Sequence, residues 1–226
     1  MTGFESLYPF LYSGATDVDA VLAQVSRSTT EKTAEITRLR ADVLERYRDQ
    51  LIECAGAMTQ SFAAGGRLFT FGNGGSSTDA QAIAELFADP GPGAQPLPSA
   101  ALTTDVAVLT ALANDVSFDV VFARSLAANG RAGDIALGLS TSGGSENVLR
   151  GFAEANRRGM LTIGLAGYDG GKMAEAGTID YLFVMPSSSV HRIQEAQTTT
   201  YHVLWELTQL ALSTGDAAVP ELDSTE

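Results

Sequence analysis

The pattern of apolar positions divides the chain into two parts. From about residue 17 to 64, apolar residues recur at spacings of three and four, which is the signature of a long amphipathic helix. This helical pattern ends at Gly65 and Gly66, where glycine commonly terminates a helix. From residue 67 onward, short apolar runs alternate with shorter helical patterns. The sequence therefore predicts an N-terminal helical extension followed by an α/β domain.

The alternating part predicts five buried strands, at 67–72, 98–104, 134–140, 161–167 and 180–186. Helical patterns are expected near 77–88, 105–113, 117–128, 145–158, 171–177 and 190–214. Strands that are apolar on both faces and separated by helices indicate a doubly wound parallel sheet flanked by helices. We expect residues 1–65 to form the extension and to make oligomer contacts, residues 66–214 to form the ligand-binding domain, and residues 215–226 to form an acidic tail.

Charge and composition exclude several classes of partner. The chain has 14 Lys and Arg against 27 Asp and Glu, a formal net charge of −13, which argues against direct binding of nucleic acid or anionic membranes. No window approaches 18 continuous apolar residues, and the N-terminus lacks the pattern of a signal peptide, so a cytoplasmic location is expected. The single cysteine, Cys54, permits no internal disulfide, and its place in a helical pattern favours a buried packing role.

Two of the predicted strands are followed by similar segments rich in glycine, serine and threonine. The first is followed by GNGGSSTD (72–79), and the third ends in STSGGSEN (140–147). Small residues let a ligand approach the backbone, hydroxyls donate hydrogen bonds, and free amides at a helix start favour an anion. Neither segment is a Walker loop or a GxGxxG turn. Ordinary loop and cap usage of serine and glycine could explain one such segment, but two at strand ends favour binding of a phosphate monoester on a polyol.

Further motifs resemble a known family. The GNGGS turn, LTALAND (109–115), STSGGSENV (140–148), GYDGGKMA (167–174) and RIQE (192–195) followed by His202 resemble the phosphoheptose isomerases. That family has the flavodoxin-like sugar isomerase (SIS) domain fold. The resemblance implies a homotetramer with active sites between subunits and an aldose–ketose isomerisation of sedoheptulose 7-phosphate. The chain is also similar to the DnaA initiator-associating protein, a relative of the same architecture that is not an enzyme.

The resemblance implies roles for individual residues. It places a sugar phosphate against the glycine turn, the phosphate group in the second strand-end segment, and sugar hydroxyls against the end of LTALAND. Gln194 is implied as a substrate contact, and Gln194 and His202 as metal ligands or catalytic groups. The remaining implied substrate contacts are Asn73, Gly74, Gly75, Ser76, Asn114, Asp115, Ser140, Thr141, Ser142 and Ser145.

The chain departs from the family where catalysis and zinc binding are concentrated. After the glycine turn, the family has a histidine and a glutamate that bind zinc, and the glutamate also acts as the base. Here those positions are Ala82 and Leu86, and Glu85 lies one residue early, about 100° around a helix.

The remaining zinc ligands form an incomplete set. Gln194 and His202 are eight residues apart, about 12 Å along a straight helix, and zinc normally takes three or four protein ligands. His191 fits a solvated residue at a helix start better than a compensating ligand, because it lies about 16 Å along the axis from His202. Zinc is therefore implied by the resemblance alone.

Isomerisation needs a base that moves a proton between neighbouring carbons. His202, Glu195 and Glu85 are the candidates, and His202 has the most suitable ordinary pKa. For Glu195, a structural role at the start of the last helix is equally compatible with the sequence. Two hypotheses stay open: an aldose–ketose isomerase acting on a phosphorylated sugar, and a non-catalytic phosphosugar sensor or adaptor with a protein partner.

Overall fold

The computed structural model describes residues 18–214 and divides into two compact units, one up to Arg38 and one from Leu39 onward. Each unit is described by itself. The described part of the first unit, residues 18–38, is the beginning of helix α2 (Val18–Ala63). Three apolar side chains in its first turns, Val21, Leu22 and Val25, are exposed by 45–60%. The predicted acidic tail at 215–226 lies outside the described residues.

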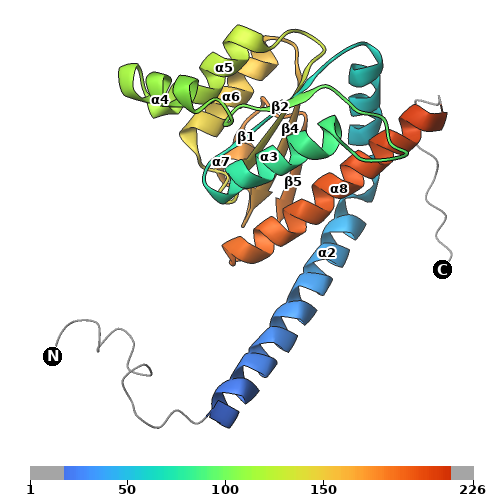
Figure 1. Cartoon of the computed structure of the whole chain (residues 1–226), viewed down its shortest axis with the longest axis vertical. Coiled ribbons are helices and arrows are strands. Elements are labelled where there is room, and N and C mark those ends of the chain that lie inside the picture. Colours follow the sequence, from blue (N-terminus) through green and yellow to red (C-terminus); the bar gives the residue numbers. More distant parts are fainter. Residues whose placement is uncertain (1–17, 215–226) are drawn as a thin grey trace. The chain divides into compact units, whose positions relative to one another are not determined.

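The second unit contains the α/β domain and the rest of α2 (Figure 1). The helices predicted from the apolar spacing are confirmed in type and order, and the second strand is shorter than expected. The elements after α2 are β1 (Leu68–Gly72), α3 (Gly75–Ala88), β2 (Ser99–Ala101), α4 (Val106–Asp115), η2 (Phe118–Val120), α5 (Val121–Asn129), β3 (Ile135–Ser140), α6 (Glu146–Arg157), β4 (Leu161–Gly167), α7 (Gly171–Glu175), β5 (Tyr181–Met185) and α8 (Val190–Thr214).

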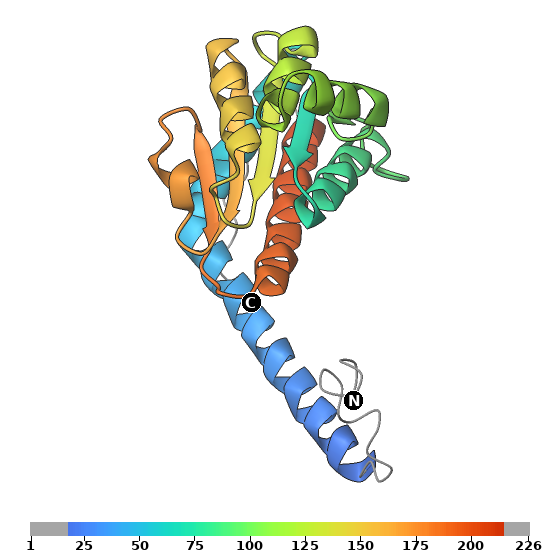
Figure 2. The ribbon, with the colours of Figure 1, turned by 90° about the vertical axis from the view of Figure 1, so that its left-hand side faces the viewer.

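The five strands form one parallel sheet in the order β2-β1-β3-β4-β5, which confirms the predicted doubly wound fold. In Figure 2 the arrows of neighbouring strands point the same way. From β1 the chain crosses to β2 on one side, and from β3 it crosses to β4 and β5 on the other. The direction of winding therefore changes between β1 and β3, and in such sheets ligands bind beyond the strand ends at this point.

Apolar side chains cover both faces of the sheet because every residue of β1 and β3 is buried. On the face covered by α5 and α6, the ring of Phe71 packs against Phe122 and Phe152 at centroid distances of 5.3 and 5.2 Å. Gly138 makes room for these rings, since a Cβ there would lie 2.6 Å from Phe152 and 2.7 Å from Phe71. Each buried phenylalanine contributes about 1.5–3 kcal/mol to folding.

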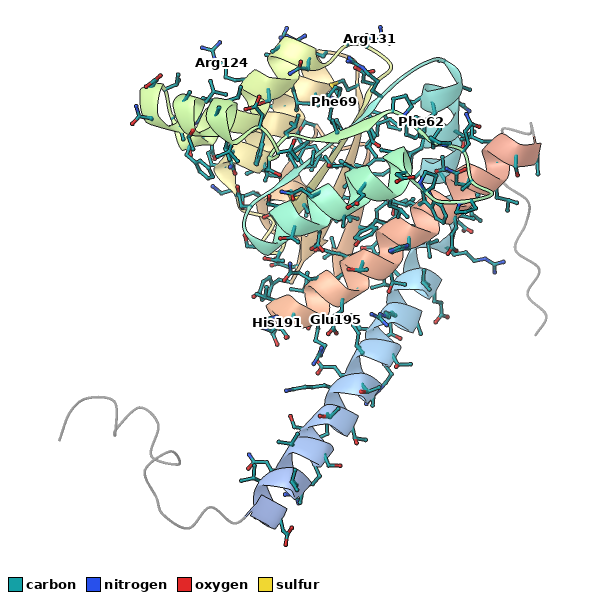
Figure 3. The ribbon with its side chains drawn as sticks, viewed as in Figure 1. Phe62, Phe69, Arg124, Arg131, His191 and Glu195 are labelled. Carbon is teal, nitrogen blue, oxygen red and sulfur yellow. The ribbon has the colours of Figure 1, made fainter. Side chains whose placement is uncertain are left out.

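The opposite face packs against α3, α8 and the part of α2 that belongs to the domain. The Tyr47 hydroxyl accepts a hydrogen bond from the Val184 amide at 3.1 Å, and the Tyr47 ring meets Phe183 edge-on at 5.4 Å. Phe62 stacks on Phe87 of α3 at 5.8 Å (Figure 3). These contacts hold the domain's part of α2 against β5 and α3.

Helix α4 differs from the others because the structure buries none of its residues. Leu109 and Leu112 pack partly against the core, whereas Val106 is 62% exposed. The apolar surface continues beyond the helix with Val116 and Phe118, which are 54% and 49% exposed. Among residues 18–214, no helix is long and apolar enough to cross a membrane.

Candidate functional site

The loops that follow β1 and β3 are joined by a reciprocal pair of side-chain amides. Asn73 Nδ2 donates to Asn147 Oδ1 at 2.8 Å, and Asn147 Nδ2 donates to Asn73 Oδ1 at 2.9 Å. Asn147 is only 3% exposed, whereas Asn73 is partly exposed. The pair therefore ties the two loops together at the point where the winding direction changes.

Three serine hydroxyls gather on the β3 side of this pair. Ser140 is the last residue of β3, and its Oγ lies 3.1 Å from Ser145 Oγ and 3.5 Å from Ser142 Oγ. Ser142 Oγ also accepts a hydrogen bond from the Gly144 amide at 3.2 Å. Ser145 is the residue immediately before α6, where the helix dipole favours an anion, and its hydroxyl lies against Ser140 and makes no capping hydrogen bond to the helix. We call Asn73, Ser140, Ser142, Ser145 and Asn147 the strand-end cluster.

The loop around these serines rests on the backbone of the next loop. Gly143 has φ of 62°, and a Cβ there would collide with the carbonyl oxygen of Gly170. The Gly143 carbonyl accepts a hydrogen bond from the Met173 amide at 2.9 Å. Only glycine allows both the positive φ and the close approach at position 143. Because Gly170 and Met173 belong to the GYDGGKMA segment, this segment packs against the loop that carries the serines.

On the β1 side, the glycine turn leads directly into α3. Gly74, the residue before the helix, has φ of 56° and open space around its α-carbon. Ser76 is 5% exposed and lies against the backbone of Gly72, so its side chain faces inward beneath the turn. The turn thus presents backbone and glycine surface at the start of α3, which suits close approach of a ligand.

A second polar contact joins α3 to α8 beside the glycine turn. Gln194 Nε2 donates to Asp79 Oδ2 at 3.2 Å. Burial raises the pKa of the Asp79 carboxyl, and the hydrogen bond from Gln194 partly opposes that shift. Gly75 allows this contact, because a Cβ there would collide with Gln194 Nε2.

Other residues implied by the resemblance lie outside these two groups. Asn114 and Asp115 are exposed at the end of α4, where Asn114 Nδ2 donates to Asp115 Oδ1 at 2.7 Å. Thr141 is partly exposed. Within residues 18–214, no hydrogen bond joins Asn114 or Asp115 to the strand-end cluster, so their role as sugar contacts stays a prediction.

The candidate bases lie along α3 and α8. His202 is exposed and its ring stacks on Tyr201 at 5.0 Å. Glu195 forms an ion pair with Arg192, and its side chain is 42% exposed. Glu85 is exposed on α3. Figure 3 shows Glu195 near the beginning of α8, where His191 is exposed in the first turn.

The residues present do not fit a zinc ion. Gln194 is engaged with Asp79, and His202 is exposed against Tyr201. Ala82 and Leu86 offer no donor atoms. Over the described range 18–214, no group of three His, Cys, Asp or Glu residues could hold a metal ion. We therefore derive no step through zinc.

Two residues in these contacts have no role predicted from the sequence. They are Asn147, within STSGGSENV, and Asp79, within GNGGSSTD. Asn73 directly follows β1, whereas Asn147 lies seven residues beyond β3 in the first turn of α6. The strand order brings these two segments to one edge of the sheet, but it does not predict that these two side chains pair. The contact of Asp79 with Gln194 depends on how α8 packs on α3, and no local pattern indicates it.

The strand order and the helices that flank the sheet are those of an SIS domain, and comparison with known proteins agrees. Residues 33–167 match the family described as the SIS domain. The phosphoheptose isomerase of Aquifex aeolicus is 43% identical over 184 residues, which cover 79% of this chain and 95% of that protein. The phosphoheptose isomerase of Nitratidesulfovibrio vulgaris is 40% identical over 186 residues, covering 82% of this chain and 88% of that protein.

Solved structures give the same result. The phosphoheptose isomerase of Neisseria gonorrhoeae superposes with a TM-score of 0.74 at 35% identity, covering 80% of this chain and 97% of that chain. The phosphoheptose isomerase of Francisella tularensis gives a TM-score of 0.76 at 30% identity, covering 82% and 98%. The chain belongs to the phosphoheptose isomerase family of SIS-domain proteins.

Proposed function

We propose that this protein binds sedoheptulose 7-phosphate and interconverts it with the corresponding aldose without zinc. The observation that carries the proposal is the strand-end cluster, in which hydroxyls and amides of two loops converge where the winding changes. Hydroxyls and helix-start amides bind a phosphate dianion without lysine. The heptose is inferred from the names of the relatives, which are phosphoheptose isomerases.

The proposed chemistry is a proton transfer between two carbons. A base removes a proton from C1 of the ketose while the C2 carbonyl oxygen is protonated, which gives an enediol. The C1 hydroxyl then loses its proton as C2 is protonated, which leaves the aldehyde at C1 and a hydroxyl at C2. We assign the base to His202, because it lies on α8 two turns beyond Gln194 and histidine is the side chain that most often acts as a general base. Glu195 and Glu85 are the alternatives, and the ion pair between Glu195 and Arg192 favours a structural role for Glu195.

The test combines turnover with binding. Purified protein is treated with a chelator, assayed with sedoheptulose 7-phosphate, and compared with His202→Ala, Glu195→Gln and Glu85→Gln. We expect turnover to survive chelation and to fall at least about a hundredfold in His202→Ala, as for loss of a general base. The same variant should retain phosphosugar affinity. Turnover lost on chelation would contradict the metal-free proposal.

A second candidate function is a phosphosugar sensor or adaptor without turnover. The observation favouring it is the replacement of the family's histidine and glutamate by Ala82 and Leu86. Tight binding of sedoheptulose 7-phosphate without turnover, in the presence and absence of added zinc, would establish this second function in place of the first.

We also propose that the chain works as a homo-oligomer, as the resemblance implies. The exposed apolar residues on and after α4, including Val106, Val116 and Phe118, support contacts between copies. Light scattering coupled to gel filtration tests this, and a monomer at micromolar concentration would contradict it.

A further inference from the structure

The contact between Asp79 and Gln194 has a geometry that fixes the direction of an amide group. Gln194 Nε2 points to the Asp79 carboxylate at 3.2 Å. The amide lies against the glycine turn, where a Cβ on Gly75 would come within 3.1 Å of Gln194 Cδ and 3.2 Å of Oε1. The side chain is therefore confined between the turn and the carboxylate.

The surroundings of Asp79 are contributed by one face of α8. Gln194, Thr198 and Tyr201 are spaced by four and three residues, which places them on the same side of a helix. Tyr201 is 4% exposed, and the Asp79 carboxylate adds to the effect of burial in raising the pKa of its phenol. Asp79 thus lies at a half-buried boundary between α3 and α8, where Gln194 donates a hydrogen bond to it.

An amide side chain can present either its oxygen or its nitrogen to a ligand. A carboxylate accepts hydrogen bonds only, so Asp79 selects the orientation with Nε2 toward itself. This leaves Gln194 Oε1 and the second N–H for another partner. Ala82 and Leu86 supply no metal ligands, and no group of three His, Cys, Asp or Glu among the described residues could hold a metal ion. We therefore look for a partner of the Gln194 amide other than zinc.

We infer that Asp79 is a positioning residue that orients the Gln194 amide toward a hydroxyl of the phosphosugar, next to the glycine turn. This inference rests on the proposed function, because it names how the same site recognises the sugar part of its ligand. The amide discriminates the sugar from bare phosphate, while the strand-end cluster holds the phosphate itself. A site built to hydrogen-bond a hydroxyl disfavours ligands that lack it.

The experiment is a double-mutant cycle measured by calorimetry. The affinities of sedoheptulose 7-phosphate and of inorganic phosphate are measured for the full chain and for Asp79→Ala, Gln194→Ala and the double variant. We expect Gln194→Ala to weaken sugar-phosphate binding about fivefold to tenfold, the effect of one hydrogen bond, and Asp79→Ala to weaken it by less or equally. The double variant should bind no more weakly than Gln194→Ala.

Controls separate positioning from general loss of structure or charge. Inorganic phosphate affinity should stay unchanged or rise in Asp79→Ala, since removing a carboxylate also removes repulsion. Asp79→Asn keeps the size of the side chain but can present either its oxygen or its nitrogen to Gln194, so it should recover only part of the sugar affinity. Asp89→Ala removes another carboxylate from the end of α3, where Asp89 is exposed, and should have no effect.

Three results would overturn the inference: additive losses in the double variant, equal weakening of phosphate and sugar phosphate by Asp79→Ala, or no effect of Asp79→Ala. If the unmodified protein does not bind sedoheptulose 7-phosphate, the proposed function fails by itself. In that case, NMR of the Gln194 side-chain amide tests whether Gln194 bonds to Asp79 in solution, and the signal is identified by its loss in Gln194→Ala. In Asp79→Ala this signal should shift and its protons should exchange faster with water. An unchanged signal refutes the pairing.

Discussion

The amide pair between Asn73 and Asn147 allows a sharp prediction, because its members differ in burial. Asn147 is 3% exposed, whereas Asn73 retains access to water. Replacing Asn147 by leucine, which has nearly the same shape, removes two hydrogen bonds but leaves Asn73 free to bond to water. Replacing Asn73 by alanine removes the same two bonds and leaves a buried amide without its partner.

The magnitudes follow from this asymmetry. Each neutral hydrogen bond contributes about 0.5–1.5 kcal/mol net, so Asn147→Leu should cost about 1–3 kcal/mol, reduced by the apolar side chain that it buries. Asn73→Ala should cost the same loss plus about 1–3 kcal/mol for the unsatisfied Asn147 amide. The less buried residue is therefore expected to be the more costly to remove.

Urea denaturation followed by circular dichroism measures this difference. All variants are compared at one protein concentration, because association would otherwise shift the midpoint. With a urea m-value of about 2–3 kcal/mol/M, central costs of about 4 and 2 kcal/mol should lower the midpoint by about 1.6 M for Asn73→Ala and by about half as much for Asn147→Leu. If Asn147→Leu proves as destabilising as Asn73→Ala, the reasoning from unsatisfied burial is refuted.

Three further predictions concern separate parts of the chain. Ser145→Ala should weaken phosphosugar binding by about 1.5–3 kcal/mol, the worth of a charge-assisted hydrogen bond, and an unchanged calorimetric affinity would remove Ser145 from the phosphate site. Arg157 and Arg158 lower the pKa of Glu154 to about 2, so the stability from these pairs should be present above pH 4.5 and be lost as the pH falls toward 2. Because Arg157 is exposed, Glu154→Gln should cost only about 1 kcal/mol at pH 7 and nothing near pH 2, as measured by urea midpoints. Cys54 is fully buried and its pKa is raised well above the usual value by burial, so a thiol reagent should react with it only in denaturant; fast labelling of the native protein would contradict this.

The sequence allowed prediction of the fold because its signals were local and repeated. Apolar runs such as 135–140 and 161–167 are buried on both faces, and that pattern occurs in parallel strands between helices. Strand β2 was predicted too long, since only Ser99–Ala101 pair with β1. Its neighbouring apolar residues instead pack in the turn that leads to α4.

The candidate site was predictable only in part. The two strand-end segments could be placed together because parallel strands bring their carboxyl ends to one edge. The contact between Asp79 and Gln194 joins residues 115 positions apart and depends on the packing of α8 against α3. The resemblance implied a shared role for Gln194 and His202, yet in the structure Gln194 is engaged with Asp79 of α3 and His202 is exposed.

The close approach of Gly143 to Gly170 couples the loop that carries the serines of the strand-end cluster to the loop that precedes α7. Because the backbones of Gly143 and Gly170 are in direct contact, the loop that carries the serines cannot move toward Gly170 without moving that backbone as well. A ligand that immobilises the serines should therefore also slow amide exchange in α7 (Gly171–Glu175), whose Met173 amide bonds to Gly143. Helix α7, which contributes no residue to the strand-end cluster, becomes a natural place to observe whether the loop is occupied.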